Sequence, residues 1–144
     1  MYEALSALGS VVLDPYLLFL IFATTVIGIV IGVLPGLGAT TGAALLLPFT
    51  LTMDPVHAIA VLATIYVSAT FAGSITAILI NTPGTSAAAA TTFDGFPLAQ
   101  RGEAGRALGI AVIASTFGGI VSVIVLCFAA PLLARVAYEF RPPE

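Results

Sequence analysis

Two long apolar stretches of this sequence are each interrupted by a Pro-Gly pair, at residues 35–36 and again at residues 83–84. Proline disfavours helical geometry at the residue before it, and glycine allows backbone conformations that other residues avoid. A short run rich in alanine and threonine follows each pair, and at about 1.5 Å per residue it is too short to cross a bilayer comfortably. The two interruptions therefore constrain the fold more than any other feature.

The composition places these helices in lipid. Apolar residues make up 60% of the 144 residues, charged residues only 8%, and the mean hydropathy is +1.17. A soluble domain covers its surface with about 25% charged residues. The chain has a net charge of −3 and contains no lysine, which argues against a nucleic-acid partner. These numbers predict an integral membrane protein.

We expect an all-α membrane protein with one transmembrane domain, in which long helices alternate with two short or re-entrant helices broken at Pro-Gly. The expected long spans are residues 16–34, 55–81 and 104–134, and the short segments are residues 37–52 and 84–93. Asp54 is expected to cap the second span, with Pro55 in its first turn. Charge does not decide the orientation, because two arginines lie at each end of the last span.

Small residues recur on one face of the first span. Gly28 and Gly32 lie four residues apart, with Gly36 next in phase, which is the spacing that lets helix backbones approach closely in lipid. Helix packing is the favoured interpretation of the first two glycines, and direct contact with a substrate is the alternative.

Two polar features lie outside the breaks. Residues 94–103 are the most polar stretch of the chain, and we expect them to reach an aqueous face, with Asp94 and Gly95 in a turn. His57 falls in the first turn of the second span. A solvated imidazole at the membrane interface is the favoured interpretation, and a proton relay is the alternative.

The two breaks together predict a binding site. Lipid tolerates non-helical backbone only where protein buries it or water reaches it, so two breaks indicate a polar cavity. A helix that begins after a break offers free backbone N–H groups and a positive dipole end, which bind carboxylate or phosphate. An ordinary loop is the alternative for either break taken alone. The predicted substrate-binding residues are Gly36, Gly38, Thr40, Thr41, Gly84, Thr85 and Ser86.

The helices before the breaks end in carbonyl groups, which suit a dehydrated cation. We therefore predict an ion site at Leu34, Asn81 and Thr82, with Na⁺ as the possible coupling ion and no other cofactor or metal. Proton coupling is disfavoured, because no Asp, Glu, Lys, Arg or His lies in the interior of either preceding helix, and the nearest candidate, Asp94, lies in the polar stretch. Half-helices that present N–H groups to an anion and carbonyls to an ion recur in transporters.

At these same residues the chain resembles the large membrane subunit, the permease, of the tripartite tricarboxylate transporter family. The motifs are GVLPGLG at residues 32–38, GSITAILINTPG at residues 73–84, TFDGFPLAQRGEAG at residues 92–105 and PPE at residues 142–144. They follow one another over nearly the whole chain. Family members are roughly three times longer, so the resemblance implies an N-terminal portion of a longer permease.

The resemblance implies a multi-pass protein of the prokaryotic cell inner membrane. Its expected partners are a small membrane subunit and a periplasmic solute-binding protein that delivers citrate or related carboxylates. Transport driven by an ion gradient, such as sodium symport, is implied, and the chain has no Gly-x-x-x-x-Gly-Lys pattern for ATP. No enzyme is expected, since HExxH and Gly-x-Ser-x-Gly motifs are absent. The alternative is a non-transporting structural or assembly piece of a membrane complex.

Overall fold

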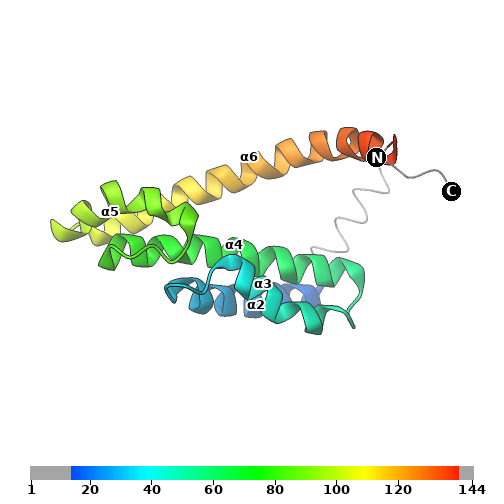
Figure 1. Cartoon of the computed structure of the whole chain (residues 1–144), viewed down its shortest axis with the longest axis horizontal. Coiled ribbons are helices and arrows are strands. Elements are labelled where there is room, and N and C mark those ends of the chain that lie inside the picture. Colours follow the sequence, from blue (N-terminus) through cyan, green and yellow to red (C-terminus); the bar gives the residue numbers. More distant parts are fainter. Residues whose placement is uncertain (1–13, 140–144) are drawn as a thin grey trace. The chain divides into compact units, whose positions relative to one another are not determined.

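The computed structural model describes residues 14–139, and within this range the chain forms helices and no strand (Figure 1). Three of these helices are long and apolar enough to cross a membrane. The expected all-α membrane fold is confirmed, while the PPE motif at residues 142–144 lies outside the described residues. The elements are α2 (Pro15–Val33), α3 (Ala39–Thr50), α4 (Pro55–Ile80), the 3₁₀ helix η1 (Ser86–Ala90), α5 (Thr91–Gln100) and α6 (Ala104–Glu139).

The chain divides into two compact units, one up to Leu108 and one from Gly109 onward. Among the described residues, the second unit consists of the part of α6 from Gly109 onward, which contains Pro131. The first unit contains α2 to α5 and both Pro-Gly breaks, so it holds everything that positions the predicted site.

Helices α2 and α4 run in the same direction and pack through small residues. Their starts lie together, because Asp14 contacts His57, and their later turns meet where Gly28 and Gly32 face Ser68 and Ala69. A side chain at Gly32 would put its Cβ 2.7 Å from the Cα of Ala69, closer than real Cβ atoms come. The glycines therefore permit close packing of the two backbones, as their spacing predicts.

The first break follows the end of α2 at Val33. The Leu34 N–H donates to the carbonyl of Ile31, and the Leu37 N–H donates to the carbonyl of Leu34, both at 3.1 Å. Gly36 then has a φ angle of +92°, a conformation that side chains disfavour. Gly36 therefore lies in the turn after the helix, as the Pro-Gly pair predicts, and not on the helical face of Gly28 and Gly32. Helix α3 runs back from this turn toward the start of α4 (Figure 1).

The second break folds back onto α4. Asn81 adopts a left-handed conformation with φ 57°, and the N–H groups of Asn81 and Thr82 both donate to the carbonyl of Thr76. The Gly84 N–H donates to the carbonyl of Gly73 at 3.3 Å. The chain thus returns about two helical turns along α4 before the next helix begins.

Gly84 is the point at which the second break touches the first helix. An added Cβ at Gly84 would meet the carbonyl oxygen of Gly32 and would lie 2.9 Å from the Cα of Gly73. Three glycines from α2, α4 and the second break therefore stack backbone against backbone. We call Gly32, Gly73 and Gly84 the glycine crossing, and it draws the two breaks together.

The polar stretch 94–103 is mostly helix rather than a loop. Helix α5 continues through Asp94 and Pro97 to Gln100, and only the residues around Gly102, which has φ +83°, form a turn. Gly95 lets α5 approach α4, since a Cβ there would lie 2.7 Å from Cγ1 of Ile78. Asp94 sits in the first turn of α5, where a carboxylate complements the helix dipole. The predicted Asp-Gly turn is therefore wrong.

Two aspartates cap the parallel helices α2 and α4. The carboxylate of Asp14 accepts from the Tyr16 N–H at 2.9 Å, and that of Asp54 accepts from the Val56 N–H at 3.0 Å. Asp54 thus fills the capping role that the sequence predicts. His57 is half-buried rather than solvated, because its Nε2 lies 3.1 Å from the Asp14 carboxylate. The imidazole therefore ties the start of α4 to the start of α2.

We expect stability to fall in acid through Asp14. Its hydrogen bonds to His57 and to the Tyr16 N–H lower the pKa of the Asp14 carboxyl below its usual 3.8. A depressed native pKa stabilises the fold above the unfolded pKa, and this stabilisation is lost as the pH falls below 3.8. As the pH is lowered from neutral to below 3.8, the unfolding temperature should fall less for Asp14→Asn than for wild type. An equal loss in both proteins would contradict the role assigned to Asp14.

Candidate functional site

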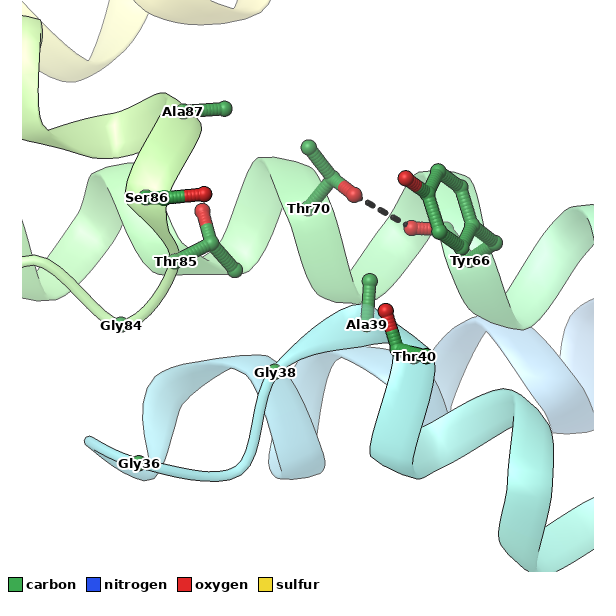
Figure 2. Close-up of a pocket in the computed structure, with 10 residues that line it drawn as sticks. All are labelled: Gly36, Gly38, Ala39, Thr40, Tyr66, Thr70, Gly84, Thr85, Ser86 and Ala87. Atoms are coloured by element: carbon green, nitrogen blue, oxygen red, sulfur yellow. Dashed lines mark hydrogen bonds between the residues drawn. The ribbon is translucent and has the colours of Figure 1, made fainter.

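A pocket of about 280 Å³ lies where the two breaks meet (Figure 2). Three segments contribute to its wall: the first break with the start of α3, the second break with the start of η1, and one face of α4. The glycine crossing explains why segments almost fifty residues apart in sequence share one pocket. The lining residues are Gly36, Gly38, Ala39, Thr40, Tyr66, Thr70, Gly84, Thr85, Ser86 and Ala87.

The pocket gathers most of the predicted substrate-binding residues. Gly36, Gly38 and Thr40 line it from the first break, and Gly84, Thr85 and Ser86 line it from the second. Thr41 is not among the lining residues. It follows Thr40 in α3, where successive residues point about 100° apart.

The residues predicted to bind a cation lie outside the pocket lining. Leu34 is half exposed, and its carbonyl accepts the Leu37 N–H. Asn81 and Thr82 close the end of α4 by donating to Thr76, and they are exposed. The structure therefore brings the predicted substrate-binding residues other than Thr41 to one pocket, whereas the three residues predicted to bind a cation lie outside it. The ion site stays a prediction.

Sequence reasoning missed the α4 wall of the pocket. Tyr66 and Thr70 lie four residues apart on α4 and both line the pocket (Figure 2). Residues four apart share a helix face, so two polar side chains at this spacing in an apolar helix were the available signal. The Thr70 hydroxyl donates to the Tyr66 carbonyl at 2.7 Å.

The pocket lining is polar without being charged. Hydroxyl groups and glycine backbone supply its polar atoms, and none of its lining residues is acidic or basic. Among the described residues, no group of three or more His, Cys, Asp or Glu side chains could hold a metal ion. An ionic ligand would therefore meet backbone dipoles and hydroxyl groups rather than a charged side chain.

The start of α3 differs from the starts of the two long helices beside it. Gly38 is its N-cap residue, and no side chain donates or accepts a capping hydrogen bond there. The first turn of a helix leaves N–H groups without intrahelical partners. Since Gly38, Ala39 and Thr40 line the pocket, these N–H groups lie at its wall. The positive end of the α3 dipole lies there too.

Thr85 is the one described residue with a fully buried side-chain polar atom that lacks a hydrogen-bond partner. Its Oγ1 lies against Gly73, where an added Cβ would be 2.7 Å away. Buried hydroxyl groups almost always have partners, and an unpaired one costs about 1–3 kcal/mol. Thr85 thus lines the pocket while its own hydroxyl lies unpaired against α4.

Apolar spanning helices, two broken segments and a polar, uncharged pocket between them are typical of a membrane transporter. The chain belongs to the tripartite tricarboxylate transporter TctA family, whose family model matches residues 18–144. The family is a transporter family, and three helices long and apolar enough to cross a membrane agree with a multi-pass membrane protein.

One curated relative shows how much of such a protein this chain represents. The chain is 47% identical over 123 residues to an uncharacterised 52.8 kDa protein of Agrobacterium vitis, described as lying in the TAR-I ttuC′ 3′ region. The match covers 85% of this chain and 24% of the relative. The chain therefore spans about a quarter of that protein. No solved structure matches it.

Proposed function

We propose that the chain is part of the permease of a secondary transporter that imports tricarboxylates or related organic carboxylates. In this proposal one carboxylate group of the substrate binds in the pocket, at the start of α3, and contacts Thr40, Thr85 and Ser86. Membership in the tricarboxylate transporter family supports the substrate class. The polar, uncharged pocket supports the place of binding.

One comparison within the chain carries the proposal. Helices α2 and α4 each receive a carboxylate oxygen at their first turn, from Asp14 and Asp54. Helix α3 has Gly38 at the same position and opens onto the pocket. A substrate carboxylate bound there would make the contacts that the two aspartates make elsewhere. Such contacts need no cationic side chain.

The depth of the pocket fits transport. Tyr66 and Thr70 lie 11 and 15 residues after Pro55, which is about 17 and 23 Å along a helix of 26 residues. The pocket therefore faces the middle part of α4. Substrate sites of secondary transporters lie near the bilayer midplane, at discontinuous helices, where either side of the membrane can gain access.

The remaining parts of the proposal follow the family. A periplasmic solute-binding protein would deliver the carboxylate, and a small membrane subunit would accompany the permease in the prokaryotic inner membrane. An ion gradient would drive uptake, with Na⁺ as the proposed coupling ion. The uncharged pocket supports cation coupling, because a co-transported Na⁺ would offset the negative charge of the substrate.

Binding to the purified, complete permease tests the proposal. We expect citrate or a dicarboxylate such as succinate to raise the unfolding temperature in Na⁺ and to raise it less in an equal concentration of K⁺. Calorimetric titration should likewise show tighter carboxylate binding in Na⁺ than in K⁺. Intact helical signal with no carboxylate binding in either salt would contradict the proposal and favour the structural or assembly role. Equal binding in both salts would contradict only the assignment of Na⁺ as the coupling ion and would leave the proposed carboxylate site standing.

A further inference from the structure

The α4 wall of the pocket offers one polar group that the chain does not use. Thr70 has its hydroxyl hydrogen bonded to the carbonyl of Tyr66. Among the residues whose side chains the structure describes, none forms a hydrogen bond with the phenol of Tyr66, and this side chain is about half exposed, at 52%. Figure 2 shows Tyr66 beside Thr70 on this wall, with the α3 start and the second break as the other walls.

The position of Tyr66 along α4 makes this phenol unusual. Tyrosines of membrane proteins gather at the two interfaces, where the hydroxyl meets water. Tyr66 lies about 17 Å from the start of α4, well inside the span. A phenol at that depth without a partner is costly in lipid. Tyr66 also lines the pocket, which offers its hydroxyl polar surroundings in place of lipid.

The pocket has room for more than one carboxylate group. Its volume of about 280 Å³ is several times the roughly 30 Å³ that one water molecule occupies in the liquid. A substrate held by one carboxylate at the start of α3 would therefore extend toward another wall. Of the side chains on the α4 wall, only Tyr66 has a hydroxyl free to donate.

We propose that Tyr66 determines specificity by donating a hydrogen bond to a second carboxylate of the substrate. This inference rests on the proposed function, because it requires the first carboxylate to bind at α3. Hydrogen bonds from a neutral donor to a charged acceptor are stronger than those between neutral groups. A site that hydrogen bonds one group of its substrate discriminates against an analogue that lacks it. Tyr66 would thus select dicarboxylates and tricarboxylates over monocarboxylates.

The test compares Tyr66→Phe with wild type in the complete permease. Citrate and succinate serve as probes with more than one carboxylate, and butyrate serves as a probe in which a methyl group replaces one carboxylate of succinate. We expect Tyr66→Phe to weaken citrate or succinate binding by about tenfold or more. Butyrate binding should change by less than about twofold, because it makes no contact with the lost hydroxyl. The unfolding temperature without ligand should not fall.

Tyr16→Phe is the matched control, since Tyr16 is an exposed tyrosine of α2 outside the pocket. Its binding constants should equal those of wild type. The inference is overturned if Tyr66→Phe binds citrate and succinate with wild-type affinity. It is also overturned if the affinities for citrate, succinate and butyrate all fall by the same factor. Wild type that binds none of the three would overturn the proposed function, and the role of Tyr66 with it.

Discussion

Replacing Gly38 with aspartate is expected to weaken carboxylate binding in the pocket strongly while leaving the protein at least as stable as wild type. Gly38 has φ −72° and ψ 171°, an extended conformation that any residue adopts. An added Cβ there meets no atom within 4 Å. The new carboxylate would therefore reach the first turn of α3 as Asp14 and Asp54 reach α2 and α4. It would occupy the contacts proposed for the substrate.

The two effects of Gly38→Asp have different sizes. Exchanging one good N-cap residue for another changes stability by only a few tenths of a kcal/mol. An attached carboxylate competes with the substrate at an effective concentration of about millimolar or more, and it also repels the substrate charge. We expect citrate affinity to fall by at least about tenfold, measured by calorimetric titration of the complete permease.

Two further variants isolate the cause. Gly38→Ala adds a side chain without a carboxylate and should lower affinity much less. Gly105→Asp introduces the same charge at an exposed glycine of α6 that has no atom within 4 Å of an added Cβ and does not line the pocket, so it should bind like wild type. Citrate binding by Gly38→Asp at wild-type strength would refute the placement of the substrate at α3.

Replacing Gly84 with alanine is expected to disrupt the glycine crossing and with it the pocket. The added methyl group would meet the carbonyl of Gly32 and the Cα of Gly73, both of which are backbone and cannot move aside as a flexible side chain can. Overpacking of this kind typically costs about 1–3 kcal/mol. The unfolding temperature should fall, and uptake of carboxylate should be lost, because the second break can no longer lie against α2.

Leucine at the same position should have a larger effect than alanine, while insertion into the membrane should remain. Gly105→Ala is the control, because an added methyl group there has no neighbour within 4 Å. Uptake into cells or vesicles, scaled to the amount of inserted protein, gives the comparison. Wild-type uptake by Gly84→Leu would place the substrate site elsewhere in the permease.

The sequence predicts the local features of this fold well. Pro35 and Gly36 end a helix through their own conformational preferences, and Asp54 followed by Pro55 starts one, so no knowledge of distant contacts was needed. The same local preferences predicted that a short helical segment follows each break. The spacing of Gly28 and Gly32 correctly indicated close helix packing, although it did not identify α4 as the partner.

The meeting of the two breaks could not be predicted from sequence, because it depends on Gly84 lying against Gly32 and Gly73. The same kind of tertiary contact explains the errors. Asp94, Gly95 and Pro97 are turn-forming residues, yet packing of Gly95 on Ile78 places them within a helix. Tyr66 and Thr70 were not predicted, because two polar residues in an apolar span do not by themselves show which face of the helix meets the breaks.

The glycine crossing also limits how this region can change in evolution. A clash between two side chains is often relieved by a second substitution that puts a smaller residue at the opposing position, but no residue is smaller than glycine. At Gly32, Gly73 and Gly84 the opposing atoms include backbone, so a methyl group gained at one position has no compensating substitution at another. Harmful changes at these three sites should therefore resist second-site suppression, unlike changes at Thr40 or Ser86.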